Sequence, residues 1–246
     1  MSVILLSRKP LLTRLNQAVR SLFANGEKGL WLDPSDLSTL YQDSAGTVAV
    51  TATGQPLGKE SDKSGRANHV SQATAAARPV YTEASGIKYL AFDGVDDGLA
   101  TATFAAGTLT SNMDVFVAVK RNTASELCTI FSRGGTSFLG AFATAGVSPE
   151  GAAYFGAGAP SMWVDGALVP GGNSRLALGG ALTIGAWRVV EFRNVNLSAW
   201  TDIGLATYPG YRPAMSVVGV VVSVAQSDAK RTQIRQYLAN KVGVVL

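Results

Sequence analysis

Hydrophobic residues near the start of the chain recur at the period of an α-helix. Pro10 can begin such a helix, and Asn25-Gly26 ends it. Between them one apolar stripe, spaced by three and four residues, consists of Leu12, Leu15, Val19 and Leu22. A helix of about four turns is not stable alone, so we expect another surface to cover the stripe. That surface is the chain's own domain, a second copy in a short bundle, a larger assembly, or a membrane surface.

Further along the chain the two-residue period of β-strands takes over. Residues 114–120 (DVFVAVK) are apolar on both faces, which predicts a central strand, and residues 127–132 are expected to be its neighbour. The continuous apolar run at residues 216–225 predicts a second buried strand. Asp165-Gly166 predicts a hairpin turn within residues 162–168.

The last third of the chain adds more strands and a terminal helix. Residues 182–190 and 191–197 predict at least two strands, and residues 200–213 are expected to form a loop. Ser227 is a suitable N-cap for a helix that reaches about Asn240. Gly243 is expected to follow the end of that helix.

The segment GIKYLAFDGVDDGLAT, residues 86–101, predicts a strand, a tight reversal and a second strand. Its three aspartates have two interpretations. Asp93, Asp96 and Asp97 could bind calcium, since a hard cation needs several close oxygen ligands. They could also shape the two Asp-Gly turns through hydrogen bonds to their own backbone. No further acidic residue lies close by in the sequence, which favours the turn.

Four blocks of sequence resemble a known family of domains. They read WLDPSDLSTLYQDSAGT, DKSGRANHVSQATAAARP, YLAFDGVDDGL and RQYLANKVGV, in that order. Together they are similar to the laminin-G-like, concanavalin A-like jelly-roll domains of tailed-phage and prophage virion proteins, over residues 29–246. The resemblance implies an all-β fold, a concanavalin A-like jelly-roll β-sandwich of two antiparallel sheets. Residues 1–28 would form an N-terminal helical arm, and a short helix would close the domain.

Composition and charge agree with many short strands and narrow the range of partners. Charged residues make up 15% and apolar residues 47% of the chain, and 27 residues are glycine. The net charge of +4 lies entirely within residues 1–28, which are expected to contact an acidic partner, while the remaining residues balance. This pattern lacks the basic face of a nucleic-acid-binding domain. No apolar run is long enough to span a bilayer, and the single cysteine, Cys128, is expected to be buried.

The sequence offers no recognisable catalytic or metal-binding constellation. Glucanases of similar fold carry closely spaced carboxylates on one strand, but the six glutamates here are never within four residues of one another. His69, the only histidine, cannot build a zinc site alone and is expected to have a structural hydrogen-bonding role. We therefore expect no enzyme activity, no cofactor and no metal.

Sugar-binding sites combine exposed aromatic rings with polar loop residues, and four residues are candidates for such a site: Trp163, Trp200, Tyr208 and Tyr211. The fold hosts lectins, enzymes and structural modules alike, so it does not fix a function. We expect a virion structural protein, made in the host cytoplasm and forming homo-oligomers. Its arm would hold it to other virion proteins of the tail, baseplate or fibre, and it would contact a cell-surface glycan. The alternatives are a carbohydrate-binding module or a capsid decoration protein.

Overall fold

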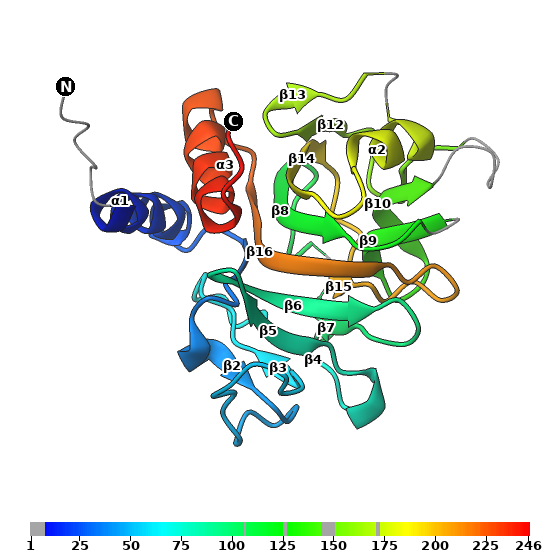
Figure 1. The fold of residues 1–246 in the computed structure, drawn as a ribbon. Helices are drawn as coiled ribbons and strands as arrows, with labels where there is room; N and C mark the ends of the chain where they lie inside the picture. Colours follow the sequence, from blue (N-terminus) through cyan, green and yellow to red (C-terminus); the bar gives the residue numbers. More distant parts are fainter. Residues whose placement is uncertain (1–7, 106, 125–126, 144–150, 171–172) are drawn as a thin grey trace.

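The computed structural model is a β-sandwich in which two antiparallel eight-stranded sheets enclose one hydrophobic core (Figure 1). It describes all residues except 1–7, 106, 125–126, 144–150 and 171–172. The side chains of residues 8–12 are also outside the description. The all-β class and the two antiparallel sheets agree with the sequence prediction. None of the helices in the described residues is long and apolar enough to cross a membrane.

The first sheet, called sheet A, contains the longest strands of the molecule. Its order is β13 (Ala167–Leu168), β12 (Ser161–Val164), β14 (Trp187–Val195), β8 (Met113–Arg121), β16 (Ala214–Val224), β6 (Ile87–Asp93) and β5 (Val80–Ala84), with β1 (Gly29–Leu32) also paired to β16.

The second sheet, called sheet B, is built mainly from short strands. Its order is β11 (Tyr154–Phe155), β10 (Ser137–Ala143), β9 (Leu127–Arg133), β15 (Gly204–Leu205), β7 (Leu99–Thr101), β4 (Val70–Ser71), β3 (Lys59–Glu60) and β2 (Leu40–Tyr41).

Strands β8 and β16 are central because both of their faces are buried. On β8, Val115, Val117 and Val119 point into the core between the sheets, while Phe116 and Ala118 point to the opposite side. That opposite side of sheet A is covered by α3 (Asp228–Val242) and α1 (Arg8–Arg20), which lie next to each other (Figure 1). The continuous apolar runs of both strands were therefore correctly interpreted.

Glycine at position 219 of β16 allows helix α3 to lie close to sheet A. A Cβ atom at this position would come within 3.1 Å of the Leu238 Cδ2 atom of α3. The pairing of β16 with β8 also shifts register between Val217 and Gly219. Val217, Val220 and Val222 consequently face the core between the sheets, while Val218 and Val221 face α3.

The arm packs on its own domain. The stripe residues Leu15, Val19 and Leu22 are 5%, 0% and 3% exposed. They share a cluster with Ile234 and Leu238 of α3 and with the outer side of sheet A. Leu22 belongs to η1 (Ser21–Phe23), the 3-10 turn that follows α1. The side chain of Leu12, the fourth residue of the stripe, lies outside the described residues. Of the surfaces considered for the stripe, the chain's own domain covers the three described residues.

The local predictions for the Asp165-Gly166 hairpin and for the two ends of the C-terminal helix are confirmed. Strands β12 and β13 form the hairpin over Asp165-Gly166. Helix α3 begins after Ser227, whose side chain accepts a hydrogen bond from the Lys230 backbone N–H, and Gly243 ends it in a left-handed conformation. These features depend on neighbouring residues alone, so local chemistry was sufficient to predict them.

Three predictions about strands are wrong. Strand β9 does not pair with β8; it lies in sheet B between β10 and β15. Residues 86–101 contain two strands, as predicted, but the reversal does not pair them, because β6 pairs with β5 and β16 in sheet A whereas β7 pairs with β4 and β15 in sheet B. Residues 182–197 contain one long strand, β14, preceded by the short helix α2 (Arg175–Ala181). In each case long-range pairing, which local periodicity does not report, decides the outcome.

Two 3-10 turns complete the described elements. One is η2 (Leu37–Thr39), for which Asp36 is the N-cap, and the other is η3 (Ala75–Ala77), which precedes β5. Cys128 is buried in the core, as predicted.

Candidate functional site

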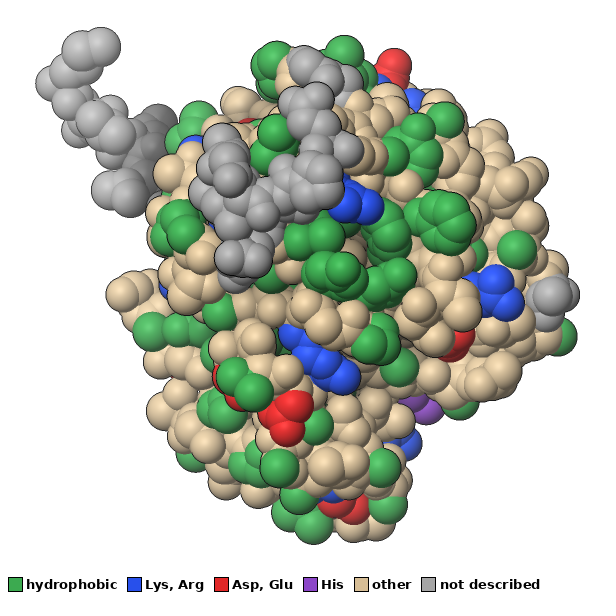
Figure 2. Space-filling model, turned by 90° about the vertical axis from the view of Figure 1, so that its right-hand side faces the viewer, with side chains coloured by type: hydrophobic (Ala, Val, Ile, Leu, Met, Phe, Trp, Pro, Cys, Tyr) green, Lys and Arg blue, Asp and Glu red, His purple; other side chains and the backbone are tan. Residues whose placement is uncertain are grey.

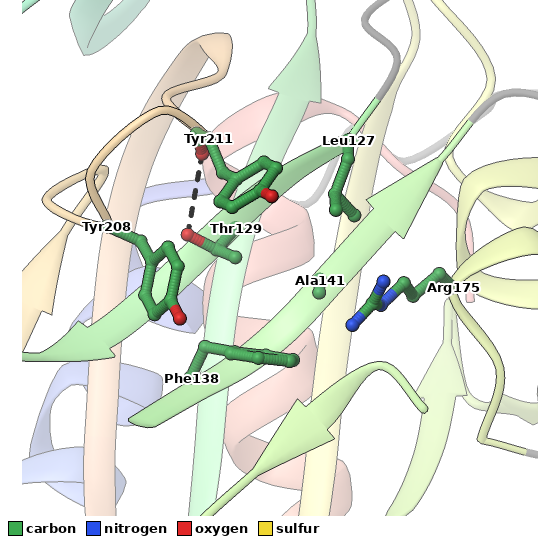
Figure 3. Close-up of a pocket in the computed structure, with 7 residues that line it drawn as sticks. All are labelled: Leu127, Thr129, Phe138, Ala141, Arg175, Tyr208 and Tyr211. Atoms are coloured by element: carbon green, nitrogen blue, oxygen red, sulfur yellow. Dashed lines mark hydrogen bonds between the residues drawn. The ribbon is translucent and has the colours of Figure 1, made fainter. Parts of the chain in front are cut away.

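A pocket of about 130 Å³ opens beside strands β9 and β10 (Figure 3). It is lined by Leu127 and Thr129 of β9, Phe138 and Ala141 of β10, Arg175 of α2, and Tyr208 and Tyr211 from the loop between β15 and β16. Hydrophobic side chains gather near the middle of the face viewed in Figure 2, with basic side chains beside them. The pocket therefore combines aromatic rings, hydroxyl groups and one cationic side chain.

The aromatic rings around the pocket form a continuous row in which each ring contacts the next. The ring centroids of Tyr208 and Tyr211 are 5.5 Å apart, and Phe138 meets Tyr208 edge-on at 5.5 Å. Phe155 of β11 stacks on Phe138 at 6.1 Å. Phe155 is 62% exposed and Tyr211 is 39% exposed. Edge-to-face and offset contacts are favourable for aromatic pairs and limit ring motion, so these rings form a preformed apolar surface.

Backbone hydrogen bonds hold the tyrosine loop against strand β9. The Thr129 backbone N–H donates to the carbonyl oxygen of Tyr211 at 3.0 Å, and the Tyr211 N–H donates to the carbonyl oxygen of Tyr208 at 3.1 Å. The second bond closes a turn that places both tyrosine rings on the same side. The pocket is thus formed by chain segments that are far apart in the sequence.

Gly140 allows two residues of β10 to line the pocket together. Residues three apart on an uninterrupted strand point to opposite faces, yet Phe138 and Ala141 both reach the pocket. Gly140 has a φ of 76°, and a Cβ atom there would lie 2.9 Å from the Phe192 Cζ atom. Glycine meets both requirements, because it adopts positive φ without steric cost and leaves room for Phe192.

Arg175 is the one charged residue among the lining residues that the structure describes. Its Nε–H donates to the carbonyl oxygen of Ala152 at 3.0 Å, and its guanidinium carbon lies 5.5 Å from the centroid of the Phe138 ring. Within the described residues no carboxylate pairs with it, and no hydrogen bond uses its terminal nitrogens. Figure 3 shows the guanidinium extending from α2 towards Phe138.

The four aromatic residues predicted for ligand binding divide between this pocket and other sites. Tyr208 and Tyr211 lie in the pocket. Trp200 does not, because it is 1% exposed in the core between the sheets and its Nε1–H donates to the carbonyl oxygen of Gly156 at 2.8 Å. The prediction for Trp200 is therefore corrected: its ring packs the core and is not presented to a ligand.

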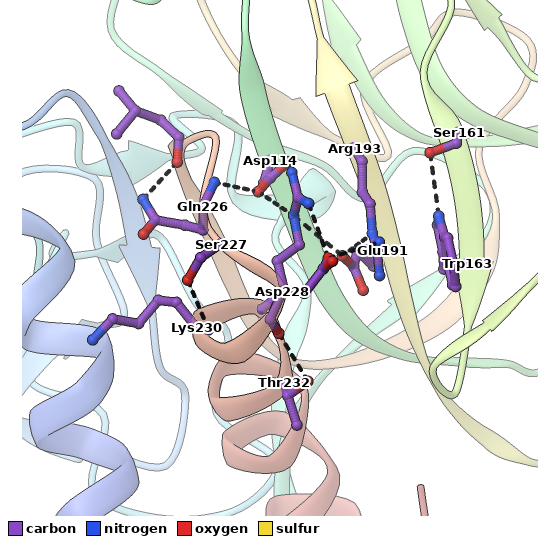
Figure 4. Close-up of polar contacts among 12 residues, drawn as sticks. Asp114, Ser161, Trp163, Glu191, Arg193, Gln226, Ser227, Asp228, Lys230 and Thr232 are labelled. Atoms are coloured by element: carbon purple, nitrogen blue, oxygen red, sulfur yellow. Dashed lines mark hydrogen bonds and ion pairs between the residues drawn. The ribbon is translucent and has the colours of Figure 1, made fainter.

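Trp163 is half-buried on sheet A and belongs to a different cluster. The Arg193 guanidinium covers its ring at 3.7 Å, and its Nε1–H donates to the Ser161 hydroxyl (Figure 4). Arg193 in turn pairs with the fully buried Glu191. Trp163 is therefore separate from the pocket that Tyr208 and Tyr211 share.

Buried ion pairs hold helix α3 to sheet A beside Trp163. Glu191 of β14 pairs with Arg235 at 2.6 Å, and Asp114 of β8 pairs with Arg231 at 2.9 Å. Both carboxylates are 0% exposed. Because each is matched by a guanidinium of α3, their charges are compensated on burial. The acidic side chains of this region (Figure 4) therefore have a structural explanation.

A second buried ionic cluster, which was not predicted from the sequence, joins β1, β3 and α3. Asp33, just after β1, accepts hydrogen bonds from Lys241 at 2.7 Å, Lys63 at 3.1 Å and the Tyr237 hydroxyl at 2.9 Å. Burial alone would raise the pKa of Asp33, but Lys241 and Lys63 outweigh it and hold the pKa well below its ordinary value.

Glu60 of β3 lies next to Asp33 and behaves in the opposite way. One carboxylate oxygen, Oε1, accepts a hydrogen bond from the Asp33 backbone N–H, whereas Oε2 is buried without a partner. Burial, followed by the nearby charge of Asp33, raises the pKa of Glu60 to about 8. Glu60 is therefore mainly protonated at neutral pH.

Asp93, the last residue of β6, lies close to Asp96 and Asp97 of the turn that follows, and their hydrogen bonds shape this turn. Their carboxylate oxygens lie within 4.8 Å of one another. Asp93 Oδ1 accepts hydrogen bonds from the backbone N–H groups of Val95, Asp96 and Asp97, and Asp97 Oδ2 accepts one from the Asp93 N–H. Burial, with the neighbouring aspartates, raises the pKa of Asp97 to about 6. The turn interpretation accounts for these contacts without an ion.

His69 has the kind of structural contact expected for it. Its Nδ1 atom accepts a hydrogen bond from the Asp62 backbone N–H at 2.9 Å. This contact joins the ends of the loop between β3 and β4.

Five of the described lining residues were not predicted from the sequence: Leu127, Thr129, Phe138, Ala141 and Arg175. Phe138 lies in an alanine- and glycine-rich stretch for which no ligand-binding role was predicted, and Arg175 begins a helix that was not predicted. The spacing of aromatic residues between glycines was the one available signal. It could indicate an aromatic surface but could not identify the loop that completes it.

Comparison with known proteins gives distant structural likenesses alone. No family model matches the sequence, and no curated protein matches it. A solved structure of Trypanosoma rangeli sialidase in complex with 2,3-difluorosialic acid is similar, with a TM-score of 0.46 and 13% identity over 95% of this chain and 38% of that chain. The complex with the inhibitor DANA has a TM-score of 0.43 and 12% identity over 96% of this chain and 39% of that chain.

The prediction that the chain is not an enzyme is contradicted by this comparison, because the similar structures are those of an enzyme. We therefore withdraw that prediction. The present chain spans about two fifths of the sialidase chains, and the likeness carries neither an activity nor a substrate over to it. No phage or laminin-G-like family is identified by these comparisons.

Proposed function

We propose that this chain is a tailed-phage virion protein whose concanavalin A-like jelly-roll domain attaches to a glycan on the host surface. The observation that carries the binding role is the pocket in which Tyr208 and Tyr211 stand beside Phe138. Sugar rings present apolar C–H faces and hydroxyl groups, and a tyrosine supplies both an apolar ring and a hydroxyl. The virion role rests on the four sequence blocks that resemble phage structural domains.

The size of the pocket indicates what part of a glycan it would hold. Its volume of about 130 Å³ is below the range of about 300–1,000 Å³ that is usual for small-molecule sites. It would therefore receive one terminal sugar residue, while the exposed ring of Phe155 extends the contact surface next to it. A module of this kind depends on many copies per particle, because several weak contacts made together bind far more tightly than one.

The test is a panel of bacterial surface glycans and lipopolysaccharides, measured with the purified protein and with the variant Tyr211→Ala. We expect the protein to bind at least one glycan and the variant to lose at least tenfold in affinity, because stacking of an exposed ring contributes to the contact.

The matched control is Tyr89→Ala. Tyr89 is a half-buried tyrosine on sheet A whose ring meets Trp187 at 5.5 Å, so this variant loses a comparable aromatic pair away from the pocket. If Tyr89→Ala weakened glycan binding as much as Tyr211→Ala does, the binding site would not be the pocket. Absence of binding across the whole panel would remove the glycan-binding role.

A further inference from the structure

We propose that the pocket beside β9 and β10 selects acidic sugars, and that Arg175 is the residue that recognises their carboxylate. The inference rests on the proposed glycan-binding function and specifies the chemical class of the glycan.

The charge of the pocket lining is the first reason. Of the seven lining residues that the structure describes, Arg175 alone is charged, and the others are aromatic, aliphatic or hydroxyl-bearing. From this described part of the lining a ligand meets one positive charge and no negative charge. The two tyrosine hydroxyls and the Thr129 hydroxyl add neutral polar groups, which suit the sugar hydroxyls.

The bonding of Arg175 is the second reason. Four other arginines of the described residues, Arg188, Arg193, Arg231 and Arg235, each form an ion pair with a carboxylate. Arg175 instead uses its Nε–H on the Ala152 carbonyl oxygen. Within the described residues its two terminal nitrogens have no hydrogen-bond acceptor, although the side chain is half-buried.

The position of the guanidinium is the third reason. Its contact with the Phe138 ring, together with the Ala152 hydrogen bond, holds its plane at one end of the pocket (Figure 3). A guanidinium held in this way offers paired N–H groups that match the two oxygens of a carboxylate. A carboxylate bound there would leave the rest of the sugar ring facing Tyr208 and Tyr211.

The experiment compares sugars that differ at one group. Oligosaccharides ending in glucuronic or galacturonic acid are tested against the same oligosaccharides ending in glucose or galactose, by calorimetry at low and high salt. Two further comparisons are included. Methyl esters of the uronic acids remove the charge but keep the shape of the sugar, and 6-sulfated neutral sugars show whether a sulfate can replace the carboxylate.

We expect the acidic sugars to bind at least tenfold more tightly than the neutral ones, with a preference that falls as salt rises. Arg175→Gln should reduce the affinity for the acidic sugars by about ten- to hundredfold, as expected for loss of hydrogen bonds to a charged group. Arg175→Lys should recover part of the loss, because it restores the charge without the planar pair of donors.

The matched control is Arg78→Gln. Arg78 is also a half-buried arginine that donates hydrogen bonds to carbonyl oxygens, those of Gln72 and Ala73, and it lies outside the pocket lining. The thermal unfolding midpoints of both variants report whether the fold is retained.

The outcomes separate the two proposals. If acidic and neutral sugars bound with equal affinity, and Tyr211→Ala abolished this binding, the acidic preference would be overturned. The proposed glycan-binding function would still hold. An acidic preference that Arg175→Gln does not change would overturn the role of Arg175. Absence of binding in every arm, alongside a silent glycan panel, would overturn both.

Discussion

At the scale of single residues, the buried cluster of Glu60 and Asp33 makes stability depend on pH. The pKa of Glu60 is raised from 4.5 to about 8 in the folded protein, first by burial and then by Asp33. Between these two values the unfolded chain releases the Glu60 proton while the folded chain keeps it. The folded state therefore binds more protons, and the free energy of unfolding falls as pH rises through this window. Above pH 8 the contribution levels off.

The variant Glu60→Gln isolates this contribution, because its side chain keeps the acceptor for the Asp33 N–H and does not ionise. One pKa unit corresponds to about 1.4 kcal/mol, so as pH rises from 4.5 to 8 we expect the free energy of unfolding of the variant to increase relative to that of the parent by on the order of 5 kcal/mol. Urea unfolding measured across this range tests the expectation. Glu83→Gln, an exposed position of β5, is the control. Parallel pH profiles for the parent and Glu60→Gln would contradict the account.

Residues also mark the limit of what the sequence could predict about the site. Tyr208 and Tyr211 could be proposed from their type and loop position, and both line the pocket. Trp200 has the same signal but lies in the core, because burial depends on which strands pack over a loop. Arg175 could not be identified as a pocket residue from the sequence, because its position there depends on its contacts with Phe138 and Ala152. Contacts between distant segments carry that information, and single residue types do not.

At the scale of elements, helix α1 and the turn η1 are expected to stabilise the fold through the cluster that they share with α3. Leu22 of η1 is 3% exposed in this cluster. Removing a buried leucine side chain loses its transfer free energy and leaves a cavity, so Leu22→Ala should lower the free energy of unfolding by about 2–5 kcal/mol. Chemical unfolding followed by circular dichroism measures this loss.

The control for this element is Gln17→Ala on the exposed side of α1. A substitution there should change the free energy of unfolding by less than about 0.5 kcal/mol. An equally small effect of Leu22→Ala would mean that the arm is not held against α3 in solution.

Helices and strands were predicted well where their own residues determine the structure. They were predicted poorly where pairing with distant strands determines it. The two-sided apolarity of β8 and β16 indicated their central position, and the caps of α3 were readable from Ser227 and Gly243. Strand β9 follows β8 in the chain, which suggested a pair, but it lies in the opposite sheet. The Asp93 turn likewise leads from sheet A to sheet B. Sheet membership is set by pairing across the whole fold, which local periodicity does not contain.

At the scale of the whole molecule, the charge distribution separates a neutral sandwich from a basic arm. Leu15, Val19 and Leu22, the described residues of the arm's apolar stripe, are buried within the chain, so we expect the arm's exposed side to make the proposed contact with other virion proteins. Arg14, Gln17 and Arg20 lie on that side. A basic surface held on a fixed helix suits an acidic partner, because complementary charge raises the rate of encounter and selects the partner.

The double variant Arg14→Glu and Arg20→Glu tests whether the basic exposed side of the arm contacts other virion proteins. We expect it to fold with an unfolding midpoint close to that of the parent, since both positions are exposed, and to be incorporated into particles at a level reduced at least several-fold. Phage particles purified from cells supplying the variant are analysed by mass spectrometry, and light scattering of the free protein reports its oligomeric state. The control, Lys88→Glu and Arg78→Glu, makes the same change of charge on the sandwich. If the double variant were incorporated as well as the parent, the basic side of the arm would not be what holds the protein in the particle. If the control lost as much incorporation as the double variant, the effect would be assigned to net charge alone.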